Sequence, residues 1–168
     1  MSYDLGHEDG RGAENLNFKN LWMLQVREAM DELGMLCHVR CRRFPSLPDW
    51  VYLAPDVQKI YDHFNDGWDL PEGADPKLVK RIGTYLERTW ALLDEEPLKP
   101  ARGIPAYKLS SCDDWLVSAN EVRSALDACK ASGRHIEDIC SNPRDLELWA
   151  EWIAWLEESV ECGGFRVS

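Results

Sequence analysis

The sequence lacks any long apolar stretch. No uninterrupted apolar run in its 168 residues approaches the roughly 18 residues that a helix needs to span a bilayer. Residues 1–18 also lack a basic segment followed by an apolar one, the pattern of a secretory signal peptide. We therefore expect a cytoplasmic protein without a membrane partner, and we expect its six cysteines to be reduced thiols.

Basic residues are few. The chain has 19 lysines and arginines against 30 acidic residues, and its formal net charge is −11. Residues 1–84 carry −4 and residues 85–168 carry −7, so the acidity is spread along the chain. Such a surface repels nucleic acid and anionic lipid, although charge of this kind also serves solubility alone. We expect no direct nucleic-acid binding, and we expect any charged partner protein to present a basic surface.

Motifs of catalysis and of cofactor binding are also missing. The sequence contains no G-x-S-x-G, no glycine-rich phosphate loop and no H-E-x-x-H. His63 stands beside Asp62, which suggests a general base, but it lies off the apolar face of its segment and fits a solvated helix residue better. We assign no catalytic residue and no cofactor. Cysteine and histidine side chains that are distant in sequence can still converge in space, so the motifs favour a non-enzyme without excluding an enzyme.

Apolar periodicity predicts a mainly α fold, a compact bundle of about five helices. Capping signals mark three helix starts: Asp75 before Pro76, the S-x-x-E box that begins at Ser118, and Asn142 before Pro143. The helices are expected at residues 18–34, 56–68, 76–95, 118–131 and 143–162.

The remaining segments predict a small β element and a division of the chain. Two or three strands are expected near 106–117 and 165–168, with the last strand beside residues 114–117. Residues 1–16 are polar and rich in glycine, which indicates a flexible arm. Three prolines in residues 96–105 indicate a linker between an N-terminal helical half (17–95) and a C-terminal half with helices and strands (106–168). We expect the two halves to form one globular domain.

Three of the eight tryptophans, Trp149, Trp152 and Trp155, fall within seven residues. On a helix, the first two belong to the inward apolar stripe, whereas Trp155 lies at its margin. An exposed aromatic side chain with carboxylates around it is typical of a protein-binding surface. We therefore predict a protein-interaction site at Trp155, with Glu151 and Glu158 at its rim.

One cluster of basic residues stands out in this acidic chain. His38, Arg40, Arg42 and Arg43 fall within the segment CHVRCRR, residues 37–43. Arginines form forked hydrogen bonds with phosphates and carboxylates. The cluster either pairs with the protein's own carboxylates or binds a small anionic ligand.

The C-terminal 55 residues or so combine a W-L-V segment with a W-x-x-W-I … G-G-F-x-V ending. In this respect they resemble small uncharacterised proteins of bacteria and their phages. The resemblance rests on Trp115, Leu116, Val117, Trp152, Ile153, Leu156, Gly163, Gly164 and Phe165. These are packing and turn residues, and the family has no known activity, so the resemblance implies only the fold of this half.

The sequence is compatible with two functions. The first is a small, acidic, non-catalytic protein-interaction module such as an inhibitor, an immunity-type protein or a phage accessory protein. The alternative is a binder of a small anionic ligand, such as a nucleotide, through the arginine cluster and a stacking aromatic residue. Arginines that meet an exposed aromatic ring in a concave site would favour the ligand. An acidic face with an exposed tryptophan would favour a protein partner.

The first prediction concerns metal. Cys37, His38 and Cys41 have the spacing of a partial zinc site, but a structural zinc site needs four ligands and no second pair of comparable spacing occurs. We expect elemental analysis of the purified protein to find no bound metal. A content of about one zinc per chain, with a melting temperature that falls on chelation, would contradict this expectation.

Overall fold

A computed structural model describes residues 2–10, 16–41, 43–95 and 102–168. The chain forms two compact units. Met1–Cys41 and Glu95–Ser168 make up the larger one, which we call the main unit. Arg42–Asp94 make up the smaller one, the inserted unit, because the chain leaves the main unit to form it and then returns.

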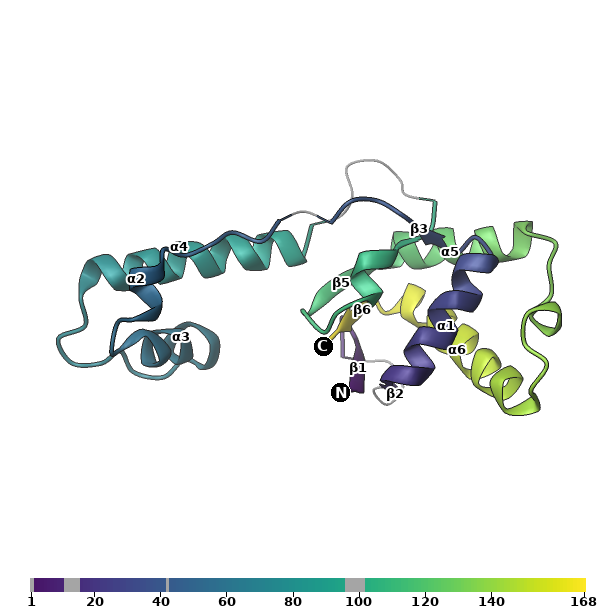
Figure 1. Ribbon diagram of the computed structural model, residues 1–168, viewed down its shortest axis with the longest axis horizontal. Coiled ribbons are helices and arrows are strands. Elements are labelled where there is room, and N and C mark those ends of the chain that lie inside the picture. The colour runs from purple at the N-terminus through teal and green to yellow at the C-terminus, as the bar shows by residue number, and fades with distance from the viewer. Residues whose placement is uncertain (1, 11–15, 42, 96–101) are drawn as a thin grey trace. The chain divides into compact units, whose positions relative to one another are not determined.

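The main unit is built on a four-stranded antiparallel sheet with the order β2-β1-β6-β5. Its strands are β1 (Ser2–His7), β2 (Leu16–Lys19), β5 (Trp115–Ser118) and β6 (Gly164–Val167). A separate parallel pair consists of β3 (Leu36–Cys37) and β4 (Ile104–Pro105). Because β1 pairs with β6, the first strand of the chain lies beside the last one, and Figure 1 shows the two chain ends close together.

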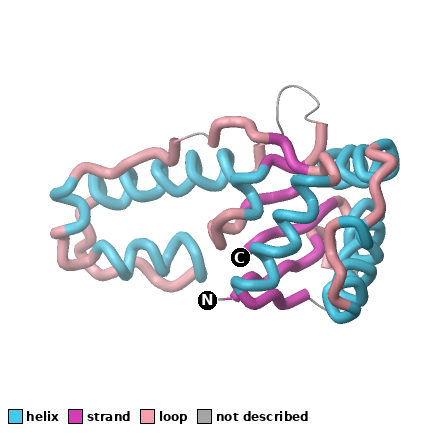
Figure 2. Tube along the Cα trace, turned by 45° about the vertical axis from the view of Figure 1, so that its right-hand side comes forward, coloured by secondary structure: helices cyan, strands magenta, loops and turns pink. Residues whose placement is uncertain are grey.

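Three long helices pack with this sheet, as Figure 2 shows in cyan beside the magenta strands. They are α1 (Asn20–Glu32), α5 (Ala119–Ala131) and α6 (Pro143–Glu161). Two 3-10 turns, η1 (Ala106–Leu109) and η2 (Ile136–Asp138), connect the elements. Helices and strands share one apolar core, whose fully buried members include Leu5, Met30, Leu109, Val117, Trp152 and Phe165.

Capping interactions begin α5 and α6 where the sequence predicts them. The Ser118 hydroxyl accepts from the Glu121 N–H at 3.4 Å, and the Glu121 carboxylate accepts from the Ser118 N–H at 2.9 Å. The Asn142 side chain accepts from the Arg144 N–H at 3.1 Å, with Pro143 in the first turn. These bonds satisfy backbone N–H groups that have no partner inside the helix.

The pairing of β6 with β5 depends on a glycine. Gly164 has a φ of +112°, and a Cβ at this position would lie 2.2 Å from the Val117 carbonyl oxygen. Only glycine allows both this backbone conformation and this approach. The predicted pairing of the last strand with the segment before the capping box is confirmed, because Trp115 lies opposite Val167 and Ser118 opposite Gly164.

The inserted unit is helical. It contains α2 (Asp49–Tyr52), α3 (Val57–Asp66) and α4 (Pro76–Leu93). Its own small core consists of Leu47, Val51, Ile60, Leu78, Ile82 and Leu86. Gly83 lies inside α4, where a Cβ would come within 2.7 Å of the Phe64 ring. The lower helix propensity of glycine is therefore offset by close packing of α3 on α4.

The predicted mainly α fold is confirmed in part. The described residues form six α-helices and are helix-rich, but their sheet has four strands, so the arrangement is not a bundle of helices alone. The flexible arm predicted for residues 1–16 is wrong over Ser2–His7, because these residues form β1 between β2 and β6. None of the helices in the described segments is long and apolar enough to cross a membrane.

The division of the chain also differs from the two consecutive halves that the sequence predicts. Helix α1 belongs to the same core as α5 and α6, so the first part of the chain folds with the last part. Of the predicted linker, residues 96–101 lie outside the described residues and residues 104–105 form β4. The boundaries of the two units are set by contacts between residues distant in sequence. Proline and glycine content cannot predict such contacts.

A buried ion pair joins η1, β5 and α5. Lys108 is 1% exposed, and its Nζ donates to Glu121 Oε2 at 2.8 Å and to the Leu116 carbonyl oxygen at 2.6 Å. The same Glu121 oxygen accepts the Ser118 N–H described above. A charge that is removed from water is tolerated only when it is paired and hydrogen-bonded. Lys108 and Glu121 therefore depend on each other.

The second prediction follows from this pair. Lys108→Met leaves the Glu121 carboxylate buried without a cation, and we expect the free energy of unfolding to fall by about 3–5 kcal/mol. Adding Glu121→Gln should restore a large part of this loss, because the amide oxygen still accepts the Ser118 N–H and no charge remains. Urea denaturation of the two variants measures the difference. Equal stability of the single and double variants would contradict the role of the ion pair.

Candidate functional site

A hollow opens between α1, α6 and the connector that precedes α6. Its volume is about 300 Å³. Five apolar side chains from the two helices contribute to its lining: Trp22, Val26, Ala29, Leu148 and Trp149. We call it the acidic hollow because of the carboxylates described next.

Three carboxylates line the acidic hollow: Glu28 and Glu32 from α1, and Asp145 from the first turn of α6. Glu32 is bound by Arg134, whose guanidinium nitrogens lie 2.9 Å from the Glu32 Oε2 and 2.9 Å from its carbonyl oxygen. Glu28 and Asp145 form no ion pair with a cation of the described segments. Two carboxylates in the hollow are therefore available to a ligand.

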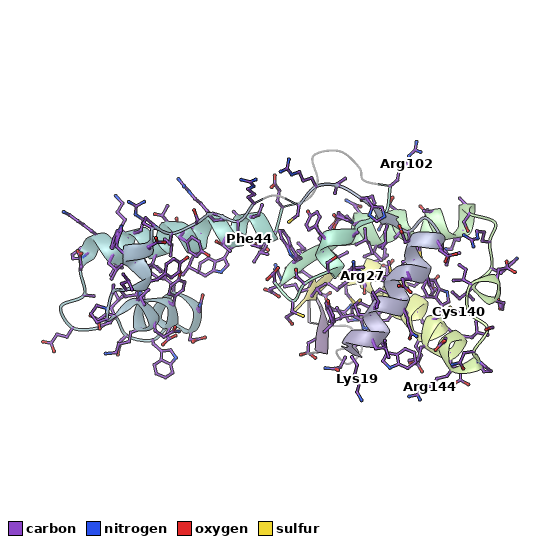
Figure 3. The ribbon with its side chains drawn as sticks, viewed as in Figure 1. Lys19, Arg27, Phe44, Arg102, Cys140 and Arg144 are labelled. Carbon is purple, nitrogen blue, oxygen red and sulfur yellow. The ribbon has the colours of Figure 1, made fainter. Side chains whose placement is uncertain are left out.

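The hollow also holds one thiol, Cys140, which Figure 3 labels in the connector before α6. Burial raises the pKa of this thiol, and the charges of Asp145 and Glu32 raise it further. A thiol with a raised pKa stays protonated at neutral pH and is a poor nucleophile. The residues lining this hollow include no histidine. The arrangement therefore suits the binding of a cation better than nucleophilic chemistry.

A second hollow, of about 250 Å³, adjoins the first and shares Trp22 and Leu148 with it. Lys19 and Arg144 line it together with Glu151, and we call it the basic hollow. The Arg144 guanidinium carbon lies 5.4 Å from the centre of the Trp22 ring, within the range of a cation–π contact. Figure 3 shows the side chains of Lys19 and Arg144 near the N-terminal end of α1. Cys140, from the connector before α6, lies beside a later turn of α1.

The predicted exposure of Trp155 is wrong. This side chain is 6% exposed. Its ring stacks on His7 at 4.6 Å and on Trp152 at 5.6 Å, and it meets Phe165 edge-on at 4.9 Å. His7 comes from β1 and Phe165 from β6, so two strands cover the flank of α6 that the apolar stripe leaves open. Trp155 belongs to the core and is not a surface for a partner.

The two acidic residues predicted around Trp155 have different surroundings. Glu151 is exposed and lines the basic hollow. Glu158 is half-buried on α6. Of the three residues predicted for protein interaction, only Glu151 lines one of the two hollows.

The residues predicted to bind an anion line neither of the two hollows. His38, Arg40 and Arg43 are exposed side chains of the segment that follows β3, and none of them lines the acidic or the basic hollow. The His38 Nε2 lies 2.7 Å from Asp31 Oδ1, a pairing with the protein's own carboxylate. Arg42 lies outside the described residues. These residues therefore do not meet an aromatic ring in either hollow, and the ligand-binding alternative is not supported there.

The residues considered for zinc binding and for general-base catalysis, Cys37 and His63, contact backbone carbonyl oxygens of the protein itself. Cys37, the first residue of the partial zinc pattern, has its Sγ 3.7 Å from the Gly103 carbonyl oxygen. In the described part of the chain, no three His, Cys, Asp or Glu side chains are grouped as metal ligands. His63 has its Nδ1 2.5 Å from the Trp68 carbonyl oxygen, and its ring packs edge-on against Phe64.

Exposed indoles are nevertheless present on the inserted unit. Trp50, Trp68 and Trp90 are 49%, 68% and 40% exposed. The exposed aromatic side chains that the sequence suggests therefore exist, but on this unit and not on α6.

Sequence reasoning missed most residues of the two hollows. Trp22 follows the apolar period of the first helix and reads as core, although it is half-buried. Glu28 and Asp145 read as solvated charges. The one available signal is the Asn142–Pro143 helix start, which places Asp145 in a first turn but does not show that α1 lies beside it.

Comparisons with protein-family models, curated proteins and solved structures find no match to this chain. The resemblance of the last 55 residues to small bacterial and phage proteins therefore stays a prediction.

The third prediction concerns the tryptophans of α6. Because Trp152 and Trp155 are both buried in the aromatic cluster, each substitution by alanine should lower the free energy of unfolding by about 3–5 kcal/mol. Trp68→Ala, at an exposed position, serves as the control and should change it by less than about 1 kcal/mol. Chemical denaturation of the three variants measures this. A Trp155→Ala protein as stable as the control would show that this indole is not part of the core.

Proposed function

We propose that the chain is a non-catalytic protein-interaction module, as inhibitors, immunity-type proteins and phage accessory proteins are. Its acidic hollow receives a basic side chain of a partner protein. One observation carries this proposal: two indoles, Trp22 and Trp149, and two carboxylates without an ion-pair partner in the described segments, Glu28 and Asp145, line the same hollow.

The chemistry of arginine and lysine matches this lining. Each has an apolar stem that packs on apolar surface and a cationic head that binds carboxylates. Indole faces also attract cations. A volume of about 300 Å³ lies at the lower end of the range of small-molecule sites, which suits one long side chain. Arginine side chains seated in such hollows are frequent hot spots of protein interfaces.

The distribution of charge supports a basic partner. The main unit has 21 acidic and 12 basic residues and a net charge of −9, whereas the inserted unit has 9 and 7 and a net charge of −2. The unit that contains the hollow therefore holds most of the negative charge. A field of this sign accelerates association with a basic protein and disfavours nucleic acid.

The proposal includes a cytoplasmic location. All six cysteines are free thiols in the fold. Unpaired cysteines persist in reducing compartments, whereas secreted domains of this size commonly use them in disulfides.

The fourth prediction tests the acidic hollow with a defined probe. The probe is the acetylated and amidated peptide Gly-Ser-Gly-Arg-Gly-Ser-Gly, compared with its norleucine analogue at the arginine position. We expect the full-length protein to bind the arginine peptide more tightly. The variant Glu28→Gln with Asp145→Asn should weaken this binding about tenfold, a loss of about 1.4 kcal/mol, because both carboxylates lose their charge. Titration at low salt, followed by tryptophan fluorescence, measures the dissociation constants.

The matched control is Glu157→Gln with Asp127→Asn, two exposed carboxylates of α6 and α5 that line neither hollow. It removes the same charge from the main unit and should change the affinity by less than about twofold. Equal binding of the arginine and norleucine peptides, or equal losses in the two double variants, would contradict the proposal.

A further inference from the structure

The basic hollow suggests what else the partner segment carries. It shares Trp22 and Leu148 with the acidic hollow, and both hollows open to solvent, so one ligand can occupy them together. Lys19 and Arg144 form no ion pair with a carboxylate of the described segments. The Arg144 guanidinium carbon lies 5.4 Å from the centre of the Trp22 ring, so a cation–π contact holds this side chain at the hollow.

The charge of this hollow selects the kind of anion. Lys19 and Arg144 supply two positive charges and Glu151 supplies one negative charge, so the hollow is positive by one. A carboxylate, which has a single charge, matches this sum. A phosphate dianion would be repelled by Glu151 and by a chain with a net charge of −11.

Positive and negative groups are ordered along the two helices. Arg144 and Asp145 are neighbours in α6, yet the first lines the basic hollow and the second the acidic one. In α1, Trp22 precedes Glu28 by six residues, about 9 Å along the helix axis at 1.5 Å per residue. The charged groups lie farther apart: Lys19, the N-cap residue of α1, precedes Glu28 by nine residues, about 13 Å along the axis. A ligand that reaches both of these side chains therefore carries opposite charges separated by up to about this distance.

An extended peptide provides this separation. Each residue advances about 3.3 Å, and side chains two or four residues apart lie on the same face. An acidic and a basic side chain at such a spacing lie about 7–13 Å apart before their own lengths are counted. A helical and an extended partner segment that carry the same two charges hold them at different distances. The distance between the charges can therefore be tested with peptides of different spacing.

We propose that the partner segment is an extended, internal stretch that carries an acidic and a basic side chain two to four residues apart. Its acidic side chain binds Lys19 and Arg144, its basic side chain binds Glu28 and Asp145, and its backbone crosses Trp22. This inference rests on the proposed function, because it assumes that the acidic hollow binds the basic side chain.

The fifth prediction uses peptides with both charges. The set consists of acetylated and amidated glycine-serine nonapeptides that carry one Glu and one Arg at spacings of two, three or four residues, in both orders. The blocked ends remove terminal charges, so the carboxylate comes only from the Glu side chain. We expect the tightest member to bind the full-length protein at least threefold more tightly than its Gln-for-Glu analogue at low salt.

A double-mutant cycle assigns this gain to the basic hollow. Against Arg144→Gln, the preference for the Glu peptide over the Gln peptide should fall below about 1.5-fold, because the remaining charge of Lys19 is balanced by Glu151. Arg88→Gln, an exposed arginine of the inserted unit, is the matched control and should keep the difference of threefold or more. Lys19→Gln is the second variant, and it repeats the test if the first lowers the melting temperature.

The outcomes separate the two proposals. If the arginine peptides bind and the variant Glu28→Gln with Asp145→Asn weakens this binding, but Glu and Gln peptides bind equally, this inference is wrong and the proposed function stands. The inference is also wrong if the difference between the two peptides persists in both Arg144→Gln and Lys19→Gln. If no peptide of the set binds, both proposals are wrong.

Discussion

The ion pair between Lys108 and Glu121 is the interaction on which the geometry of the main unit depends. It lies in the interior, where neither charge tolerates the loss of the other. Glu121 also accepts from the N–H of Ser118, the last residue of β5, and so begins α5 at a defined distance from the sheet. Because Ser118 lies opposite Gly164, this junction also sets the start of β6 and the end of the preceding helix.

The two hollows form at the surface where the outer flanks of α1 and α6 meet. Residues such as Met30 and Trp152 direct the apolar faces of these helices into the core, so the charged residues of their other faces gather around Trp22. Arg134 holds the C-terminal end of α1 through Glu32. Under the proposed function, recognition of a partner requires that this pattern of charges is held in a fixed geometry, and the packing of α1 and α6 on the core provides that rigidity.

From the sequence, one charged residue of the candidate site could be predicted, but not which charged residues lie together in space. Glu151 was predicted as an interaction residue and does line a hollow, yet the reason for choosing it, an exposed Trp155, is wrong. Glu28 and Asp145 look like any solvated carboxylates of amphipathic helices. They become a site only because residues more than a hundred positions apart approach each other, and neither periodicity nor spacing carries that information.

Local sequence patterns are sufficient to predict where several elements begin and end. The Ser118 box, the Asn142 cap and the Gly164 backbone act through atoms within a few residues or through a single backbone conformation, so local patterns predict them. Long-range packing, in contrast, sets the pairing of β1 with the last strand, the insertion of a helical unit and the burial of Trp155. These features depend on which apolar surfaces cover one another across the whole chain, and a stripe on a helix shows which face is apolar but not how much of it a sheet will cover.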